Sequence, residues 1–117
     1  MKNIQVDFIS YTLAHSLVLI DDYYGLFVQG TSMTEAGIQG GDFVVFKRYY
    51  EWIDGAIMLI MQQREGKKFS QMHRVRLSGR KWYQCWEDGS KKKTLLDDSY
   101  YPEGILMAIA RNNFFTN

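Results

Sequence analysis

The sequence contains few of the residues that cross-link or interrupt a chain. Of its 117 residues, one is cysteine and one is proline. The single thiol, Cys85, cannot form an intrachain disulfide, and this favours a reducing, cytoplasmic setting. One cysteine and two histidines, His15 and His73, are too few for a cluster of metal ligands, so we expect neither a metal nor a cofactor.

Neither charge nor hydrophobicity is concentrated in the chain. The net charge is +1, whereas a nucleic-acid-binding module usually carries a clear basic excess, so we expect no direct nucleic-acid binding. The longest uncharged apolar runs, residues 17–20 and 56–61, are far shorter than the ~20 residues of a membrane-spanning helix. The N-terminus has Lys2 and Asp7 and no sustained apolar stretch, unlike a signal peptide. We therefore predict a soluble protein without a membrane partner.

The residues that are present suit one β-rich domain. Hydrophobic residues make up 46% of the chain, enough for one core, and 117 residues leave no room for a second core, so we predict a single domain spanning residues 1–117. Segments rich in β-branched and aromatic residues alternate with turn signals such as Gly40-Gly41 and Asp54-Gly55. This spacing predicts a mainly β fold with short helical turns. The predicted strands are Tyr24–Gln29, Asp42–Lys47, Gly55–Gln63, Lys68–Leu77, Lys81–Glu87 and Gly104–Arg111.

Two segments are candidates for helical turns. Residues 12–20 fit either a helical turn or a strand, and residues 34–38 fit a single turn that follows Ser32.

The most informative stretch runs from Gly30 to Asp42. Gly30 permits a sharp reversal after a strand, and Ser32 follows at the head of one short turn, where free backbone N–H groups can receive an oxyanion. We expect Met33 and Ile38 to anchor this loop to the core, and the Asp42 carboxylate to accept turn amides. A serine after a glycine more often merely caps a turn, so this pair of residues alone does not identify a nucleophile.

The full pattern of this stretch is more specific. Gly-x-Ser-Met, then Gly-Ile, then Gly-Asp followed by apolar residues resembles the nucleophile segment of the LexA-type self-cleaving repressor peptidases, and the related UmuD-type proteins and signal peptidases share most of it. The resemblance covers most of the chain from Tyr24 onward. It implies the complex β-fold of the LexA C-terminal domain and signal peptidases, with Ser32 as nucleophile and with Thr31, Met33 and Asp42 positioning the serine or its oxyanion. The matching residues are Gly30, Ser32, Met33, Gly37, Ile38, Gly41, Asp42 and Val45, with further similarity at Asp54-Gly55 and Ile109-Ala110-Arg111.

The sequence departs from the LexA pattern at the position of the base. A lysine activates the serine in LexA-like and bacterial signal peptidases, whereas the matching run here is Met72-His73-Arg74-Val75 and places His73 there. This run resembles the His-Arg-Val run of the endoplasmic-reticulum and archaeal signal peptidases, which use serine and histidine. A histidine titrates near neutral pH without a large pKa shift, whereas a lysine must lose several pK units. Lys67 and Lys68 are the alternative bases, but they require a shift in strand register.

A catalytic histidine needs an acceptor to fix its tautomer, usually a carboxylate. Asp88, Asp97 and Asp98 are the candidates, and the last two lie where the serine–histidine signal peptidases carry acidic residues. Strand alternation directs His73 to the apolar face of its strand. The competing interpretation is that His73 is a satisfied core residue, and we interpret His15 as structural.

The resemblance also implies partners. These relatives commonly dimerise through this domain, using the sheet edge near the C-terminus, and we predict a homodimer. The aromatic pairs Tyr100-Tyr101 and Phe114-Phe115 fit either such an interface or the closing of the core. The run Lys91-Lys92-Lys93 follows a turn signal and is interpreted as a solvated hairpin tip.

Self-cleaving relatives cut an Ala-Gly or Cys-Gly bond upstream of the serine, and residues 1–31 contain no such pair. We expect either a longer chain with the cleavage site further upstream, or a chain that resembles the processed form of a UmuD-type protein.

Three functions are therefore open. The first is a serine peptidase domain of LexA or UmuD type, the regulatory and dimerisation part of a repressor or stress-response protein, acting on a peptide substrate such as its own upstream segment. The second is an interaction module that has kept the fold and lost the activity. The third is a soluble, signal-peptidase-like protease acting in trans, favoured by the run around His73 and opposed by the lack of an apolar anchor.

Overall fold

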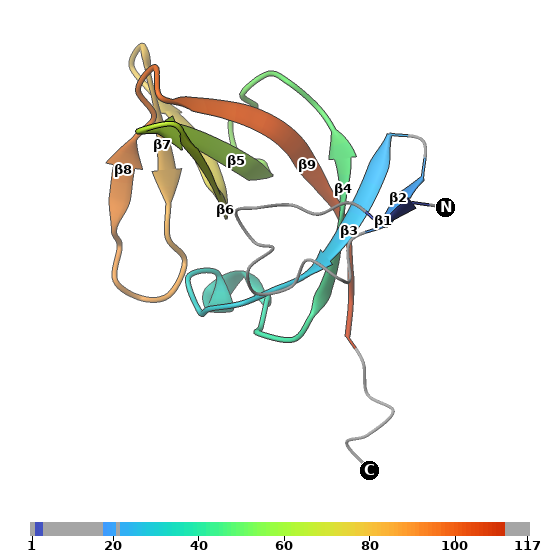
Figure 1. The fold of residues 1–117 in the computed structure, drawn as a ribbon. Coiled ribbons are helices and arrows are strands. Elements are labelled where there is room, and N and C mark those ends of the chain that lie inside the picture. Colours follow the sequence, from blue (N-terminus) through green and yellow to red (C-terminus); the bar gives the residue numbers. More distant parts are fainter. Residues whose placement is uncertain (1, 4–17, 21, 112–117) are drawn as a thin grey trace.

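The computed structural model describes residues 2–3, 18–20 and 22–111, and these form one antiparallel sheet (Figure 1). Its nine strands lie in the order β1-β2-β3-β4-β9-β5-β6-β7-β8. The strands are β1 (Lys2–Asn3), β2 (Val18–Ile20), β3 (Tyr23–Phe27), β4 (Phe43–Arg48), β5 (Ile57–Arg64), β6 (Lys67–Ser78), β7 (Lys81–Cys85), β8 (Lys93–Leu95) and β9 (Tyr100–Ala110). A single 3-10 turn, η2 (Thr34–Ala36), completes the regular structure of these ranges. None of their helical segments has the length and apolar character that a membrane crossing requires.

The predicted mainly β fold is confirmed, and the predicted strands differ from the observed ones mostly at their ends. Val18–Ile20 forms β2, so the strand alternative is confirmed for the described part of residues 12–20. His15 and Phe114-Phe115 lie outside the described residues. Strand β8 is missing from the prediction because it has only three residues and begins with Lys93, which was assigned to a hairpin tip.

The start of β9 is a correction with a clear cause. The strand begins at Tyr100 rather than at Gly104, and it therefore includes Pro102. Proline lacks an N–H group and is normally excluded from strands that have neighbours on both sides. Here β4 pairs with β9 only from Gly104 onward, and Pro102, paired with Ile60, follows a register shift at which β9 has one extra residue, Glu103, so the missing donor is tolerated.

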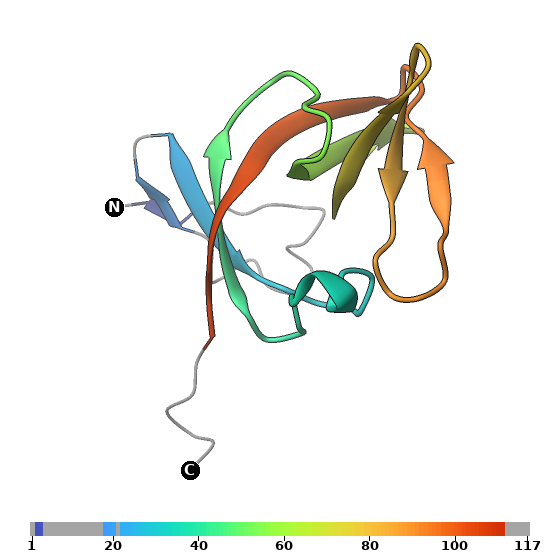
Figure 2. The same ribbon diagram turned by 180° about the vertical axis from the view of Figure 1, so that it is seen from behind.

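Strand β9 joins the two halves of the sheet. Figures 1 and 2 show it curving from the β5–β8 half to the β1–β4 half, and it pairs with β5 along its first part and with β4 along its second. Because of this curvature, apolar side chains are buried on both faces of the sheet. Strand β5, next to β9, is accordingly buried on both faces, which explains its continuous apolar run Ile57–Met61.

The two faces of β5 contribute to two separate hydrophobic clusters. Leu59 and Met61 belong to one, which we call the first cluster, and Met58 and Ile60 belong to the other, the second cluster. The other buried members of the first cluster are Leu26, Val28, Met33, Ile38, Val44 and Phe46. The other buried members of the second cluster are Val75 and Leu96, with Trp52, Ile53, Ala56, Trp82 and Tyr100 packed around them.

Candidate functional site

Ser32 lies at the head of the turn η2, as the sequence predicts. The chain reverses at Gly30, whose φ of 91° lies in the left-handed region that suits glycine. Met33 and Ile38 are 2% and 1% exposed and belong to the first cluster, so both ends of the turn are anchored in the core. The side chain of Ser32, which directly precedes Met33, is half-buried.

The backbone of this turn leaves two amides available beside Ser32. The amides of residues 34–37 already donate to carbonyl oxygens, one of which belongs to Thr31. The amides of Ser32 and Met33 donate to no other residue that the structure describes. Backbone N–H groups next to a nucleophile are the usual donors to an oxyanion, so these two are the candidates here.

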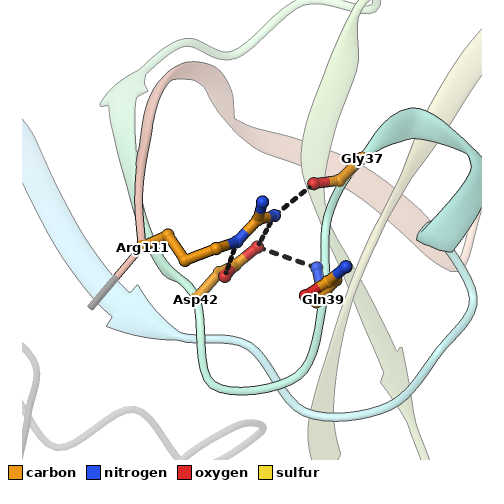
Figure 3. Close-up of polar contacts among 4 residues, drawn as sticks. All are labelled: Gly37, Gln39, Asp42 and Arg111. Carbon is orange, nitrogen blue, oxygen red and sulfur yellow. Dashed lines mark hydrogen bonds and ion pairs between the residues drawn. The ribbon is translucent and has the colours of Figure 1, made fainter. Parts of the chain in front are cut away.

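An ion pair fixes the far end of the same segment (Figure 3). Asp42 is 2% exposed, and its carboxylate accepts the backbone amide of Gln39 at 2.8 Å and both Nε and Nη2 of Arg111 at 2.9 Å. The Nη2 group of Arg111 also donates to the carbonyl of Gly37 at 2.7 Å. These hydrogen bonds from Arg111 lower the pKa of Asp42 below its usual value. The clamp thus ties residues 37–42 to the end of β9.

Glu87 ties the Ser32 turn to the other half of the sheet. Its backbone N–H donates to the carbonyl of Ser32 at 2.7 Å, and its own carbonyl accepts the N–H of Glu35 at 2.6 Å. Its carboxylate forms a two-pronged ion pair with Arg74 of β6, with N···O distances of 2.8 and 3.0 Å, which lowers the pKa of Glu87. Arg74 in turn donates to the carbonyl of Gly55 at 2.9 Å. Glu87 thus connects the Ser32 turn to the strand that carries His73.

His73 is buried on β6 in an apolar and aromatic environment. It is 3% exposed, and its ring stacks on Trp86 with centroids 3.9 Å apart. The ammonium group of Lys92 lies 4.5 Å from the centroid of the Trp86 ring, on the loop that connects β7 to β8. Burial, aided by the positive charge of Lys92 and opposed by Asp88, lowers the pKa of His73 to about 4. The ring is therefore neutral at physiological pH.

Ser32 and His73 lie on neighbouring segments, but no hydrogen bond joins their side chains in the described structure. The Nδ1 atom of His73 is buried and has no hydrogen-bond partner. Directly opposed residues of an antiparallel pair share a face, so the pairing of His73 with Met58 puts it on the face of the second cluster. Met33, next to Ser32, packs in the first cluster instead. The connection between the two residues runs through Trp86 and Glu87: one stacks on His73 and the next is hydrogen-bonded to Ser32.

Of the three acidic candidates, the structure brings Asp88 into the electrostatic environment of His73. Asp88 is exposed, and hydrogen bonds from Ser90 lower its pKa. Asp97 accepts the amide and the hydroxyl of Ser99 near the start of β9, and Asp98 is exposed beside it. The charged groups that shift the pKa of His73 are Lys92 and Asp88, and neither Asp97 nor Asp98 is among them.

The alternative bases lie at the start of the strand that carries His73. Lys67 and Lys68 are exposed and follow the turn between β5 and β6. With a strand rise of about 3.3 Å per residue, Lys68 lies about 17 Å from His73 along β6. Nothing in the observed register brings either lysine to the position of His73.

Sequence reasoning misses the roles of Glu87, Arg74 and Trp86. The link between Glu87 and Ser32 is a backbone interaction across a long sequence separation, and no side-chain pattern encodes it. The available signal is strand alternation, which directs Arg74 to the face opposite His73 and so away from the second cluster.

The antiparallel β fold and the turn that carries Ser32 agree with the β domain that the sequence resemblance implies. A family model described as Peptidase S24-like matches residues 3–77, more than half of the chain, and the chain belongs to this family. The matched region includes both Ser32 and His73 and ends within β6. No curated protein sequence shows significant similarity to the chain.

Proposed function

We propose that the chain is the regulatory peptidase domain of a LexA- or UmuD-type protein, with Ser32 as nucleophile and His73 as general base. The observation that carries the proposal is the link through Trp86 and Glu87, which holds the Ser32 turn beside the strand of His73. The membership of the Peptidase S24-like family supports the class of chemistry.

The proposed reaction is acyl transfer from a peptide bond. Ser32 Oγ attacks the scissile carbonyl while His73 takes its proton, and the protonated imidazole then gives that proton to the leaving amine. The amides of Ser32 and Met33 donate to the oxyanion of the tetrahedral intermediate. Water, deprotonated by His73, then attacks the carbonyl of the acyl-enzyme. The ester bond to Ser32 breaks, and the imidazolium returns its proton to Ser32 Oγ.

Substrate binding is part of this proposal. Ser32 and His73 are not hydrogen-bonded in the described structure, and catalytic hydrogen bonds often tighten only in the substrate complex. A histidine with a pKa of about 4 is unprotonated at pH 7 and so can accept a proton, but it is a weak base. A bound substrate that brings His73 within hydrogen-bonding distance of Ser32 and makes its surroundings more polar would form the missing hydrogen bond and raise the pKa of His73. We therefore propose a site that is assembled on binding a peptide segment, its own or that of a partner.

The second candidate is an inactive interaction module of the same fold. The low pKa of His73 and its unpartnered Nδ1 favour this candidate, because an efficient base has a pKa near the working pH and an oriented ring. A soluble signal-peptidase-like protease acting in trans is the third, supported by the Met72-His73-Arg74-Val75 run.

For the assembly and setting we propose a cytoplasmic homodimer. Beyond Ile105, β9 has no partner on its β5 side within the described ranges, so the edge of residues 106–110 is open. Met107 and Ile109 on this stretch are 53% and 41% exposed. An open edge with exposed apolar side chains is suited to pairing with the same stretch of a second copy.

Proteolysis of a mixed peptide library from pH 6 to 10, read by mass spectrometry, tests the proposal. We expect cleavage products that disappear in both Ser32→Ala and His73→Ala, with the pH profile reporting the base. Serine-dependent cleavage that survives His73→Ala would assign another base, with Lys67 and Lys68 the next to replace. Absence of serine-dependent products at every pH would favour the interaction module.

A further inference from the structure

Two polar atoms are buried without a partner on one face of the β6–β7 pair. They are Nδ1 of His73 and Oε1 of Gln84. The two residues are 3% and 1% exposed, so neither atom is compensated by bulk water. An unsatisfied buried donor or acceptor is costly, and a pair of them with complementary chemistry calls for an explanation.

The strand register places the two side chains next to each other. Gln84 pairs directly with Val75, and His73 is the next residue of β6 on the same face. Diagonal neighbours of this kind are separated by about 7–8 Å between their Cα atoms, a distance that a long side chain can bridge. Trp86, which directly follows β7, stacks on His73 and restricts its ring to this environment.

From this juxtaposition we propose that Gln84 is a positioning residue for His73. Its Oε1 accepts a hydrogen bond from Nδ1–H of the neutral imidazole, which leaves the lone pair of Nε2 free. Rotation about the side-chain torsions of Gln84 forms this bond and satisfies both buried atoms at once. The inference rests on the proposed function in one respect: the free Nε2 is the atom that takes the proton of Ser32.

The chemistry favours Gln84 over the carboxylates for this role. Asp88 is exposed and its carboxylate is engaged with Ser90, and Asp97 is engaged with Ser99. A neutral amide oxygen orients the ring without adding a negative charge that would raise the pKa of His73. A buried histidine oriented by a neutral side chain remains neutral, which agrees with its apolar surroundings.

The tautomer of His73 in solution tests the proposal. Nitrogen-15 NMR of the histidine side chains distinguishes a proton on Nδ1 from one on Nε2, and a His73→Gln sample assigns the signals against those of His15. At pH 7 we expect His73 to carry its proton on Nδ1. Gln84→Met, which removes the acceptor at similar size, should change the tautomer ratio roughly fivefold toward Nε2–H, the effect of one neutral hydrogen bond.

Two further variants separate this role from a merely structural one. Gln84→Glu keeps an acceptor oxygen but adds a negative charge that raises the pKa of His73, so at a pH above that raised pKa the neutral ring should still carry its proton on Nδ1. Gln62→Met removes another buried glutamine amide, which is hydrogen-bonded to Ser99, and should leave the tautomer unchanged. If Gln84→Met does not fold, the wild-type tautomer and the Gln84→Glu variant decide. A wild-type proton on Nε2, or an unchanged ratio in folded Gln84→Met, would overturn the proposal.

The tautomer does not depend on catalysis. A protein with the expected tautomer and no serine-dependent proteolysis would refute the proposed function and leave the Gln84–His73 pair standing. Serine-dependent proteolysis in a protein whose His73 carries its proton on Nε2 would refute the Gln84–His73 hydrogen bond and leave the proposed function standing.

Discussion

The Ser32 side and the His73 side of the candidate site are stabilised in opposite ways. On the Ser32 side, Met33 fills the first cluster, and Asp42 is fully engaged by Gln39 and Arg111. On the His73 side, buried polar atoms of the histidine and of Gln84 have no partners in the described structure. The Ser32 half is thus already satisfied, whereas the His73 half is incomplete as described and has still to gain contacts, either from a rotated Gln84 side chain or from a bound substrate.

This difference indicates which half reorganises. A segment held by core packing and charged hydrogen bonds keeps its shape, whereas buried groups without partners gain most from a new contact. We therefore expect a substrate to change the surroundings of His73 and to leave the Ser32 turn as it is.

The strongest test of the satisfied half is Met33→Ala. Removing a side chain that is 2% exposed leaves a cavity in the first cluster, so the free energy of unfolding should fall by about 3–4 kcal/mol. Urea denaturation followed by circular dichroism measures it. Met107→Ala is the matched control: that side chain is 53% exposed, and its loss should change stability by less than about 0.5 kcal/mol. Equal effects of the two substitutions would show that the Ser32 turn is not anchored by Met33.

Acidification should act on the incomplete half. The pKa of His73 in the folded protein is about 4, below the usual 6.5, so between these values the unfolded chain binds a proton that the folded chain does not. The contribution of the neutral histidine to stability is therefore complete above pH 6.5 and is lost as the pH falls toward 4, at up to about 1.4 kcal/mol per pH unit. Denaturation of wild type and His73→Leu across this range isolates the effect. If the free energy of unfolding depends on pH in the same way in both proteins, His73 is not buried in its neutral form.

Asp42→Ala removes the acceptor of the clamp. The amide of Gln39 and the guanidinium of Arg111 lose a charged partner, and we expect about 2 kcal/mol of destabilisation at pH 7. Because Arg111 lowers the pKa of Asp42, this stabilisation is present above the unfolded pKa and disappears as the pH falls through the folded one. Thermal unfolding at pH 7 and pH 3 measures both. Asp98→Ala, at an exposed position, is the control. If Asp42→Ala destabilises the protein no more than Asp98→Ala does, the clamp does not contribute to stability.

Arg74→Ala should have the smallest effect on stability and a local effect on the site. Its ion pair with Glu87 is about three-quarters buried, and its loss should cost about 1 kcal/mol. Because Glu87 holds the Ser32 turn, the amides of Glu35 and Glu87 should exchange with solvent about five times faster, as NMR hydrogen exchange would show. The exposed Arg76→Ala, two residues along the same strand face, should leave both amides unchanged. Equal exchange rates in the two variants would show that Arg74 does not stabilise the Ser32 turn through Glu87.

Much of the Ser32 side is predictable from sequence because its determinants are local. Glycines that permit the reversal, two apolar anchors and an aspartate that accepts a turn amide all lie within residues 30–42, and the turn forms as expected. Alternation likewise predicts that His73 faces inward, and the pairing of β5 with β6 agrees.

The relation between the two sides is not predictable in this way. It depends on the curvature of the sheet, on the path of the loop after β7 and on the backbone pairing of Glu87 with residues 32 and 35. No local pattern reports such long-range pairing, which is why the choice among Asp88, Asp97 and Asp98 stays open in the sequence. The strand β8 escapes prediction for a local reason, because it has only three residues and begins with Lys93.

Covalent labelling shows whether Ser32 is a nucleophile that His73 activates. The full chain is incubated with a fluorophosphonate probe at pH 8, and its intact mass and peptide map are measured beside Ser32→Ala and His73→Ala. We expect one adduct per chain, located on Ser32, absent from the first variant and formed at least tenfold more slowly in the second. A wild-type chain that stays unlabelled, or an adduct that forms equally fast without His73, would contradict this activation.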